Sequence, residues 1–234
     1  MINTDKTKPE KASMSSLRKT SLVAGVFYLL TFVSIPTLWL YSSVRGPDYI
    51  LGSGPDGLVI LGTILEMIVA LAGIGTAVTL YPVLKRQNEG FAMGFVGSRV
   101  LEAATIYVGI VSLLSVVTLR QAGAGAGALA TGQALTAQYY WTFLFGQSFI
   151  PAVNAILLGT LLYRSRLVPR ALPVLGFIGA TLLVTAWTGT VTGLLGQLSP
   201  ASALFALPIA LWEFSLGIYL IVKGFKTSPI TVGI

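Results

Sequence analysis

Apolar residues run through this chain in six long blocks that short polar segments separate. The blocks cover about residues 20–42, 57–84, 91–119, 139–163, 171–198 and 203–222. A helix needs ~20 mainly apolar residues to cross the ~30 Å hydrocarbon core of a bilayer, and every block reaches that length. Since backbone polar groups must pair internally in lipid, helices are the form expected for all six blocks. The pattern predicts an all-α integral membrane protein, a bundle of six transmembrane helices.

The segments outside these blocks predict two tails and one long loop. Residues 1–17 are polar and predict a disordered cytoplasmic tail, and residues 227–234 predict a second, short one. The six-helix domain between them covers residues 18–226. Pro36 predicts a kink in the first helix. Residues 120–138 are dominated by Gly, Ala, Thr and Gln, and this composition predicts a flexible loop before the fourth helix.

Lysine and arginine concentrate at one end of the predicted bundle. If successive helices alternate in direction, twelve of the 15 basic residues fall on the side of the N-terminus. Arg45 and Arg120 fall on the other side, and Arg99 lies inside the third helix. Cytoplasmic loops carry such an excess, which predicts that both termini are cytoplasmic. The twelve are Lys6, Lys8, Lys11, Arg18, Lys19, Lys85, Arg86, Arg164, Arg166, Arg170, Lys223 and Lys226.

The composition indicates that the lipid bilayer is the main partner of this surface. Hydrophobic residues make up 54% of the chain and charged residues 10%, against about a quarter charged in a soluble domain. The net charge is +7, but the basic residues flank the apolar blocks without forming a patch with aromatic residues, so nucleic acid is not an expected partner. Cysteine and histidine are both absent from the sequence. This excludes disulfides and thiol catalysis and removes the commonest general base and metal ligand, so we expect no metal site and no cofactor.

Several polar residues interrupt the apolar blocks at a similar depth. At ~1.5 Å per residue, Glu66, Glu102 and Glu213 come out ~13–15 Å below the outer edge of the membrane, close to its midplane. Arg99 lies one turn from Glu102 on the same helical face, and Asn154 of the fourth helix lies ~21 Å deep. Charged groups inside a membrane are costly and are candidates for function. We therefore expect one polar layer in which several helices converge.

Further aromatic and polar residues lie at the depth of this layer, and a different role is favoured for each kind. Trp212, beside Glu213 at mid-depth, does not fit the membrane interface where tryptophans usually lie, so it is a candidate for lining a pocket. Thr181 and Thr185 reach the same depth, although packing and hydrogen bonding to the backbone are the favoured roles of their hydroxyls. For Asn154 and Gln147, a hydrogen bond between helices is favoured.

The charges of the predicted layer do not balance. One arginine faces three glutamates, which leaves a formal charge of −2. Burial and like-charge repulsion both favour the protonated form of a carboxyl group. Either one or two of the glutamates carry a proton at neutral pH, or a cation or cationic ligand supplies the missing charge. The candidates for a ligand or ion pocket are Glu66, Arg99, Glu102, Asn154, Trp212 and Glu213.

Three short motifs mark the chain at its start, middle and end. They are Arg18-Lys19-Thr20, Arg-Val-Leu-Glu-Ala at residues 99–103, and Pro208-x-x-x-Trp212-Glu213 leading to Lys223-Gly224-Phe225. In this layout the chain resembles, over about residues 17–226, a bacterial six-helix membrane family catalogued as domain of unknown function 4386. The resemblance implies a multi-pass protein of the bacterial cytoplasmic (inner) membrane. It implies no activity.

Three classes of function fit these features. The first is a protein that binds or transports a small solute, ion or lipid in a polar cavity at the midplane; three helices in each half give the opposite orientations that inverted-repeat transporters require. The second is an intramembrane enzyme that uses a glutamate as acid or base on a lipid-like substrate. The third is a structural or regulatory partner whose buried charges specify assembly. The first class is favoured over an enzyme, and the sequence indicates no oligomeric state.

Overall fold

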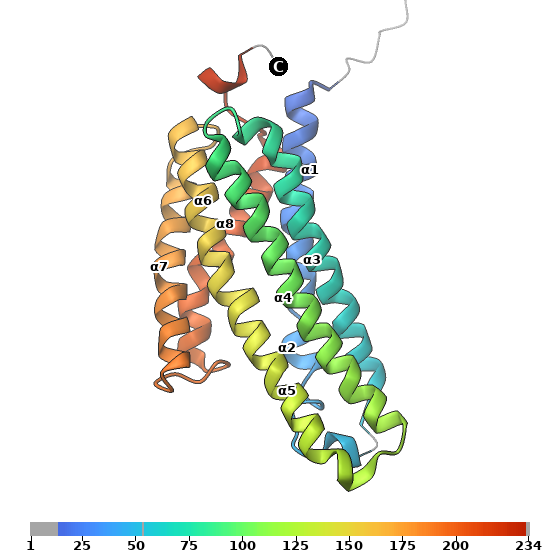
Figure 1. The fold of residues 1–234 in the computed structure, drawn as a ribbon. Coiled ribbons are helices and arrows are strands. Elements are labelled where there is room, and N and C mark those ends of the chain that lie inside the picture. The colour runs from blue at the N-terminus through green and yellow to red at the C-terminus, as the bar shows by residue number, and fades with distance from the viewer. Residues whose placement is uncertain (1–13, 53, 233–234) are drawn as a thin grey trace, which may run out of the picture.

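The computed structural model describes residues 14–52 and 54–232, and all regular elements in this part of the chain are helical (Figure 1). The α-helices are α1 (Ser16–Leu30), α2 (Thr37–Leu40), α3 (Asp56–Leu84), α4 (Glu89–Gln121), α5 (Leu129–Leu144), α6 (Ile150–Ser165), α7 (Ala171–Val191) and α8 (Pro200–Val222). Short 3₁₀ turns cover Thr31–Ser34, Tyr49–Leu51, Gly125–Ala128 and Pro229–Thr231, and a π turn covers Phe145–Phe149.

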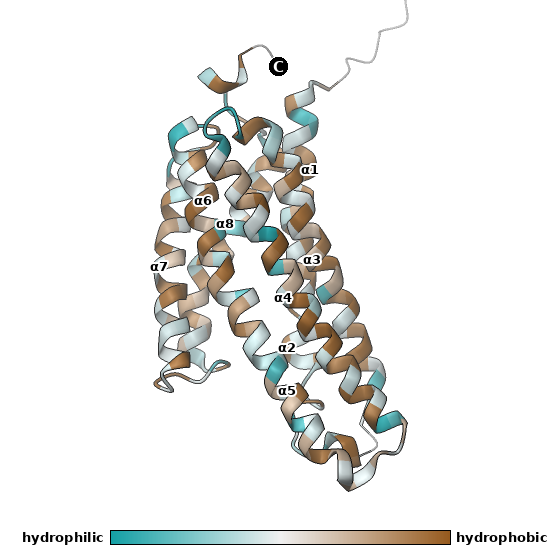
Figure 2. Ribbon diagram, in the orientation of Figure 1, coloured by the Kyte–Doolittle hydropathy of each residue, from teal (hydrophilic) through white to brown (hydrophobic). Residues whose placement is uncertain are grey.

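These helices make six segments that are long and apolar enough to cross a membrane, which confirms the predicted bundle of six helices. Two segments are composite, because α1 continues into α2 and α5 continues through the π turn into α6. Apolar residues extend along the helices from end to end (Figure 2). The two ends of the described chain lie at the same end of the bundle (Figure 1). The side of the membrane that they face stays a prediction. Of the predicted tail over residues 1–17, residues 1–13 lie outside the described residues, and Ser16 and Leu17 already belong to α1.

The helices pack in a closed ring. Helix α1 contacts α3, α3 contacts α4, α4 contacts α5 and α6, α6 contacts α7, α7 contacts α8, and α8 returns to α1. The half of the ring near the termini is filled by large apolar side chains, among them Tyr28, Phe95 and Trp212, which have no exposed surface. Toward the other end, α7 and α8 diverge from α5 (Figure 1). At that end a second buried apolar cluster holds α2, α3, α4 and α5 together.

Small residues set the closest helix crossings, as they commonly do in membranes. A Cβ atom added at Gly25 of α1 would lie 2.7 Å from the carbonyl oxygen of Gly217 in α8. A Cβ atom added at Gly179 of α7 would lie 2.6 Å from the backbone nitrogen of Ile209 in α8. At both crossings the obstacle is backbone, which cannot rotate away as a side chain can.

Replacing Gly179 with alanine is therefore expected to lower the free energy of unfolding by about 1–3 kcal/mol, because α7 and α8 must separate. Unfolding in detergent micelles by denaturant measures the change. Gly97 of α4 is the matched control, since a Cβ atom there would meet nothing within 4 Å. Its replacement by alanine should leave stability unchanged or raise it by up to about 1 kcal/mol, as expected for glycine in a helix interior. Equal effects at the two sites would contradict the packing of α7 on α8.

The first transmembrane segment breaks earlier than Pro36. The 3₁₀ turn Thr31–Ser34 interrupts the helix, and α2 resumes at Thr37. Pro36 has no N–H to donate to the carbonyl of Phe32, which instead accepts a bond of 3.2 Å from the N–H of Ile35. The predicted kink is thus spread over the turn before the proline.

Two segments differ from the sequence analysis. Residues 129–138, predicted as part of a flexible loop, form the start of α5. They are rich in Ala, Leu and Gln, which favour helix, and Gly132 serves packing: a Cβ atom there would lie 2.0 Å from Ile50. The fifth apolar block ends as a helix at Val191, because Gly193 adopts a left-handed conformation with φ +76° and starts a turn.

Candidate functional site

Arg99 of α4 holds two glutamates from different helices. Its Nη1 donates to Oε2 of Glu102, one helical turn away, at 2.9 Å. Its Nη2 donates to Oε1 of Glu213 in α8 at 3.1 Å. The arginine side chain is 3% exposed, against 10% for Glu102 and 16% for Glu213. This buried ion triad joins α4 to α8 across the ring.

The surroundings of Arg99 explain why it fits so deep in the bundle. Its guanidinium lies over the rings of Tyr28 and Phe95, at 5.6 and 5.7 Å from the ring centroids. Gly73 on α3 leaves room for its stem, since a Cβ atom there would lie 3.7 Å from Cδ of Arg99. Aromatic faces attract a guanidinium, and a neighbouring glycine has no side chain to occupy the space that the arginine needs. The glycine on α3 therefore accommodates the arginine.

Asn154 of α6 completes the site. Its Nδ2 donates to Oε2 of Glu102 at 2.6 Å, which confirms the predicted hydrogen bond between helices. We call Arg99, Glu102, Asn154 and Glu213 the charge cluster. With both glutamates ionised it carries one positive and two negative charges, so it keeps a net formal charge of −1. Each carboxylate also has a second oxygen, Oε1 of Glu102 and Oε2 of Glu213, that accepts no hydrogen bond from the described residues.

A cleft of about 630 Å³ leads to the charge cluster. Arg99, Glu102 and Glu213 line its deep end, and Arg45 and the turn between α7 and α8 line its other end. Because Glu213 lies ~20 Å along α8 from Pro200, the cleft reaches about halfway through a bilayer. Its other polar lining residues are Thr31, Ser34, Gln147, Ser148, Thr190, Gln197, Ser199 and Ser202. The remaining lining is apolar and includes Phe32, Leu38, Phe143, Leu183, Trp187, Ala206 and Ile209.

Glu66 lies in a different environment from the charge cluster. Its Oε1 accepts hydrogen bonds from the hydroxyl of Tyr139 at 2.8 Å and from Nε2 of Gln147 at 3.3 Å. The predicted single layer is therefore divided into two groups of polar side chains. Equal depth does not imply contact, because Glu66 points from α3 toward α5 whereas Arg99 points toward α8.

Trp212 and the threonines of α7 do not join either group. Trp212 is fully buried but does not line the cleft. Its ring packs against Gly176 of α7, where an added Cβ atom would lie 2.8 Å from the ring. Thr181 and Thr185 are exposed, and each hydroxyl donates to the carbonyl four residues earlier, at 3.0 and 2.9 Å. The predicted hydrogen bonds of these hydroxyls to the backbone are confirmed. The prediction that the two threonines belong to the polar layer is wrong.

The sequence pattern did not predict that tyrosines belong to both groups. Tyr28 places its hydroxyl 3.5 Å from Nη2 of Arg99, and Tyr139 donates to Glu66. A tyrosine deep in an apolar block was the available signal, because a buried phenol usually finds a polar partner.

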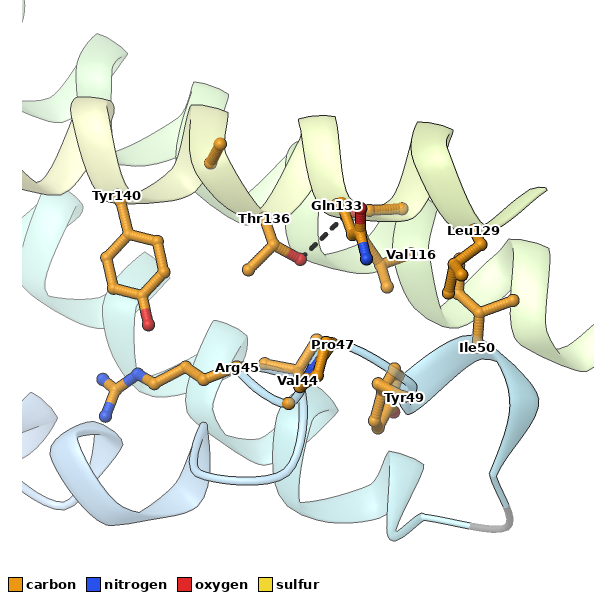
Figure 3. A pocket seen from close by; sticks show the side chains of 13 residues that line it. Val44, Arg45, Pro47, Tyr49, Ile50, Val116, Leu129, Gln133, Thr136 and Tyr140 are labelled. Atoms are coloured by element: carbon orange, nitrogen blue, oxygen red, sulfur yellow. Dashed lines mark hydrogen bonds between the residues drawn. The ribbon is translucent and has the colours of Figure 1, made fainter. Parts of the chain in front are cut away.

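A smaller pocket of about 250 Å³ lies beside α5 (Figure 3), a helix at the end of the bundle away from the termini (Figure 1). Gln133, Thr136 and Tyr140 of α5 face Arg45, Pro47 and Tyr49 of the loop across it (Figure 3).

An ion pair between Asp56 and Arg120 joins the start of α3 to the end of α4 beside this loop. The hydroxyl of Tyr49 donates to Asp56 at 2.6 Å. Burial, aided by the neighbouring carboxylate, raises the pKa of Tyr49 well above its usual range. Arg45 lines both this pocket and the larger cleft.

Comparison with known proteins gives one match. The family model described as Domain of unknown function (DUF4386) matches residues 23–224, which include the whole charge cluster and the cleft. This confirms the resemblance seen in the sequence motifs. Searches of curated proteins and of solved structures give no match.

Proposed function

The chain belongs to the family of domain of unknown function 4386, and from its geometry we propose that it binds a small amphiphilic solute bearing a cationic group, as a binding protein or transporter of the membrane. The main support is that, at the deep end of the cleft, two carboxylates pair with a single arginine. A cationic group there would neutralise the remaining formal charge. It would also bond to the two carboxylate oxygens that accept no hydrogen bond from the described residues.

The walls of the cleft support an amphiphilic body. Ligand pockets commonly enclose about 300–1,000 Å³ and are mainly apolar with a few polar groups, and this cleft has both properties. Leu38 and Ile35, which line it, are 51% and 59% exposed, so the cleft also borders the lipid-facing surface. An apolar tail can therefore lie against these residues while the charged head reaches Glu213.

The arrangement of helices supports transport as the use of this site. Arg99 and Glu102 belong to the third transmembrane segment and Glu213 to the sixth, so each half of the chain supplies a carboxylate from its last segment. A site shared by two halves can change its access when the halves rock against each other. A purely structural role is less favoured, because a tightly packed core with balanced charge would serve it better.

We further propose that the cleft opens to the non-cytoplasmic side of the bacterial inner membrane. Basic residues cluster at the helix ends near the termini, among them Arg18, Lys85, Arg86 and Lys223. Such an excess marks cytoplasmic ends. The turn between α7 and α8, which lines the mouth of the cleft, lies at the opposite end (Figure 1).

Tetraphenylphosphonium, a cation with an apolar shell, tests this proposal. Binding to the protein in nanodiscs, corrected with empty nanodiscs, is expected to weaken about tenfold or more in Glu213→Gln, because a charge-assisted contact is lost. The anion tetraphenylborate, which has nearly the same shape, should bind much more weakly than the cation. Glu89→Gln is the matched control, since Glu89 is exposed at the start of α4 and lies outside the cleft. Equal binding of the two ions, or no effect of Glu213→Gln, would contradict the proposal.

A further inference from the structure

Glu66 is a buried carboxyl group whose hydrogen-bonding partners are uncharged. It is 1% exposed, and it accepts from Tyr139 and Gln147. Its second oxygen, Oε2, is enclosed and has no hydrogen-bond partner among the described residues. The hydroxyl of Tyr41 is enclosed and unpartnered as well.

Tyr41 and Glu66 are neighbours. The ring of Tyr41 meets the ring of Tyr139 edge-on, with centroids 5.3 Å apart. It also packs on Gly62, one helical turn before Glu66, where a Cβ atom would lie 3.0 Å from the Tyr41 hydroxyl. The two unpartnered oxygens thus face the same small space. The Tyr41 hydroxyl can therefore donate to Oε2 as a further uncharged partner of Glu66, which brings no counter-charge to the carboxyl group.

Positive charges near Glu66 are engaged elsewhere. Arg99 reaches α3 at Gly73, two turns away, and is paired with Glu102 and Glu213. Arg45 makes no ion pair with Glu66 among the described residues, and its Nη1 donates to the carbonyl of Leu38 at 2.8 Å. The titratable or charged groups facing Glu66 are then Tyr139 from α5, Tyr41 after α2 and, farther off, Arg45. On the next turn of α3, the packing against α4 is apolar and involves Val69, Ala70, Ala103, Ile106 and Ile110.

Gln147 connects Glu66 to the cleft. Its amide donates to Glu66, and the same side chain lines the cleft. It lies in the π turn Phe145–Phe149. Pro151 follows two residues after this turn, and its missing N–H leaves the carbonyl of Gln147 without its usual helical donor. Local π turns occur often at functional sites, where they re-aim a side chain. A change at Glu66 can therefore reach the cleft wall through one residue.

We propose that Glu66 is a proton-binding site that carries a proton at neutral pH and is coupled to the cleft through Gln147. A carboxyl group with neutral partners inside a membrane is costly to ionise, and protonation removes that cost. The coupling rests on the proposed function: a cation in the cleft favours the ionised form of Glu66, so the cation and the proton oppose each other. By linkage, the proton weakens cation binding by the same factor by which the cation weakens proton binding.

Infrared spectroscopy of the whole protein in lipid tests the proton site without any ligand. The carbonyl stretch of a protonated carboxylic acid should be present at neutral pH and absent in Glu66→Gln, while Glu102→Gln and Glu213→Gln retain it. Tyr139→Phe should shift the frequency of this band, because it removes a donor to the same carboxyl group. Absence of the band in the wild type at neutral pH, or its persistence in Glu66→Gln, would overturn the proton site.

Tetraphenylphosphonium binding tests the coupling separately. In a weakly buffered solution, the wild type should release protons as the cation binds, and Glu66→Gln should release fewer. Cation binding with equal proton release in the two proteins would overturn the coupling. If the infrared band assigns the proton to Glu66 but the cation does not bind, the proton site stands and the proposed function fails. If the cation binds but the band is absent, the proposed function stands and the proton site fails.

Discussion

Replacing Arg99 with leucine is expected to lower the free energy of unfolding by about 3–5 kcal/mol, because it leaves Glu102 and Glu213 buried without their counter-ion. The loss also removes the ion pair that links α4 to α8 across the ring at mid-depth. Denaturant unfolding in detergent micelles, followed by tryptophan fluorescence or helicity, measures the change. The triple variant Arg99→Leu/Glu102→Gln/Glu213→Gln should recover most of the lost stability, since a neutral replacement of a buried ion group is often tolerated.

Arg86→Leu is the control for the loss of a positive charge as such. Arg86 lies after α3 at the end of the bundle near the termini, and its contact to the carbonyl of Ile230 is exposed and 3.4 Å long. Its replacement should change stability by less than about 1 kcal/mol. If Arg99→Leu behaves like Arg86→Leu, or if the triple variant is no more stable than the single one, the buried triad does not stabilise the bundle.

The six helices could be predicted because lipid constrains length and backbone hydrogen bonding so strongly. The errors fall where these constraints are weakest. Residues 129–138 are less apolar than the blocks, so composition favoured a loop, yet they continue α5 as a helix that packs against the loop before α3. At the end of the fifth block, apolar residues such as Leu194 and Leu198 resemble a helix in hydropathy but follow the left-handed Gly193 in a turn.

For the candidate site, the sequence predicted which residues are buried and charged but not all of their partners. The rise of a helix assigns a depth to each residue, and Arg99, Glu102, Asn154 and Glu213 do meet. Depth carries no information on how each helix is rotated about its axis, which depends on packing with its neighbours. The separation of Glu66 from this cluster could therefore not be derived from its depth.

Single cysteines introduced into α8 are expected to react with a thiol reagent at very different rates, according to whether they line the cleft or lie on the outer surface of the bundle. The natural sequence contains no cysteine, so each variant carries one thiol. Ala210, one turn before Glu213, lines the cleft, whereas the adjacent Leu211 is 47% exposed on the outer surface and does not line it. A thiol reacts as thiolate, which forms in contact with water and is suppressed in apolar surroundings. Both substitutions are at nearly the same depth, so depth alone cannot cause a difference.

The rate at which a membrane-impermeant thiol reagent modifies these two variants tests the central claim most directly. With reagent added outside intact cells, Ala210→Cys should react roughly tenfold or more faster than Leu211→Cys, because an aqueous path leads from the outer surface to the charge cluster. Bound tetraphenylphosphonium should slow the reaction at residue 210 and leave that at residue 211 unchanged. Equally slow modification at both positions would contradict a water-accessible cleft at this site.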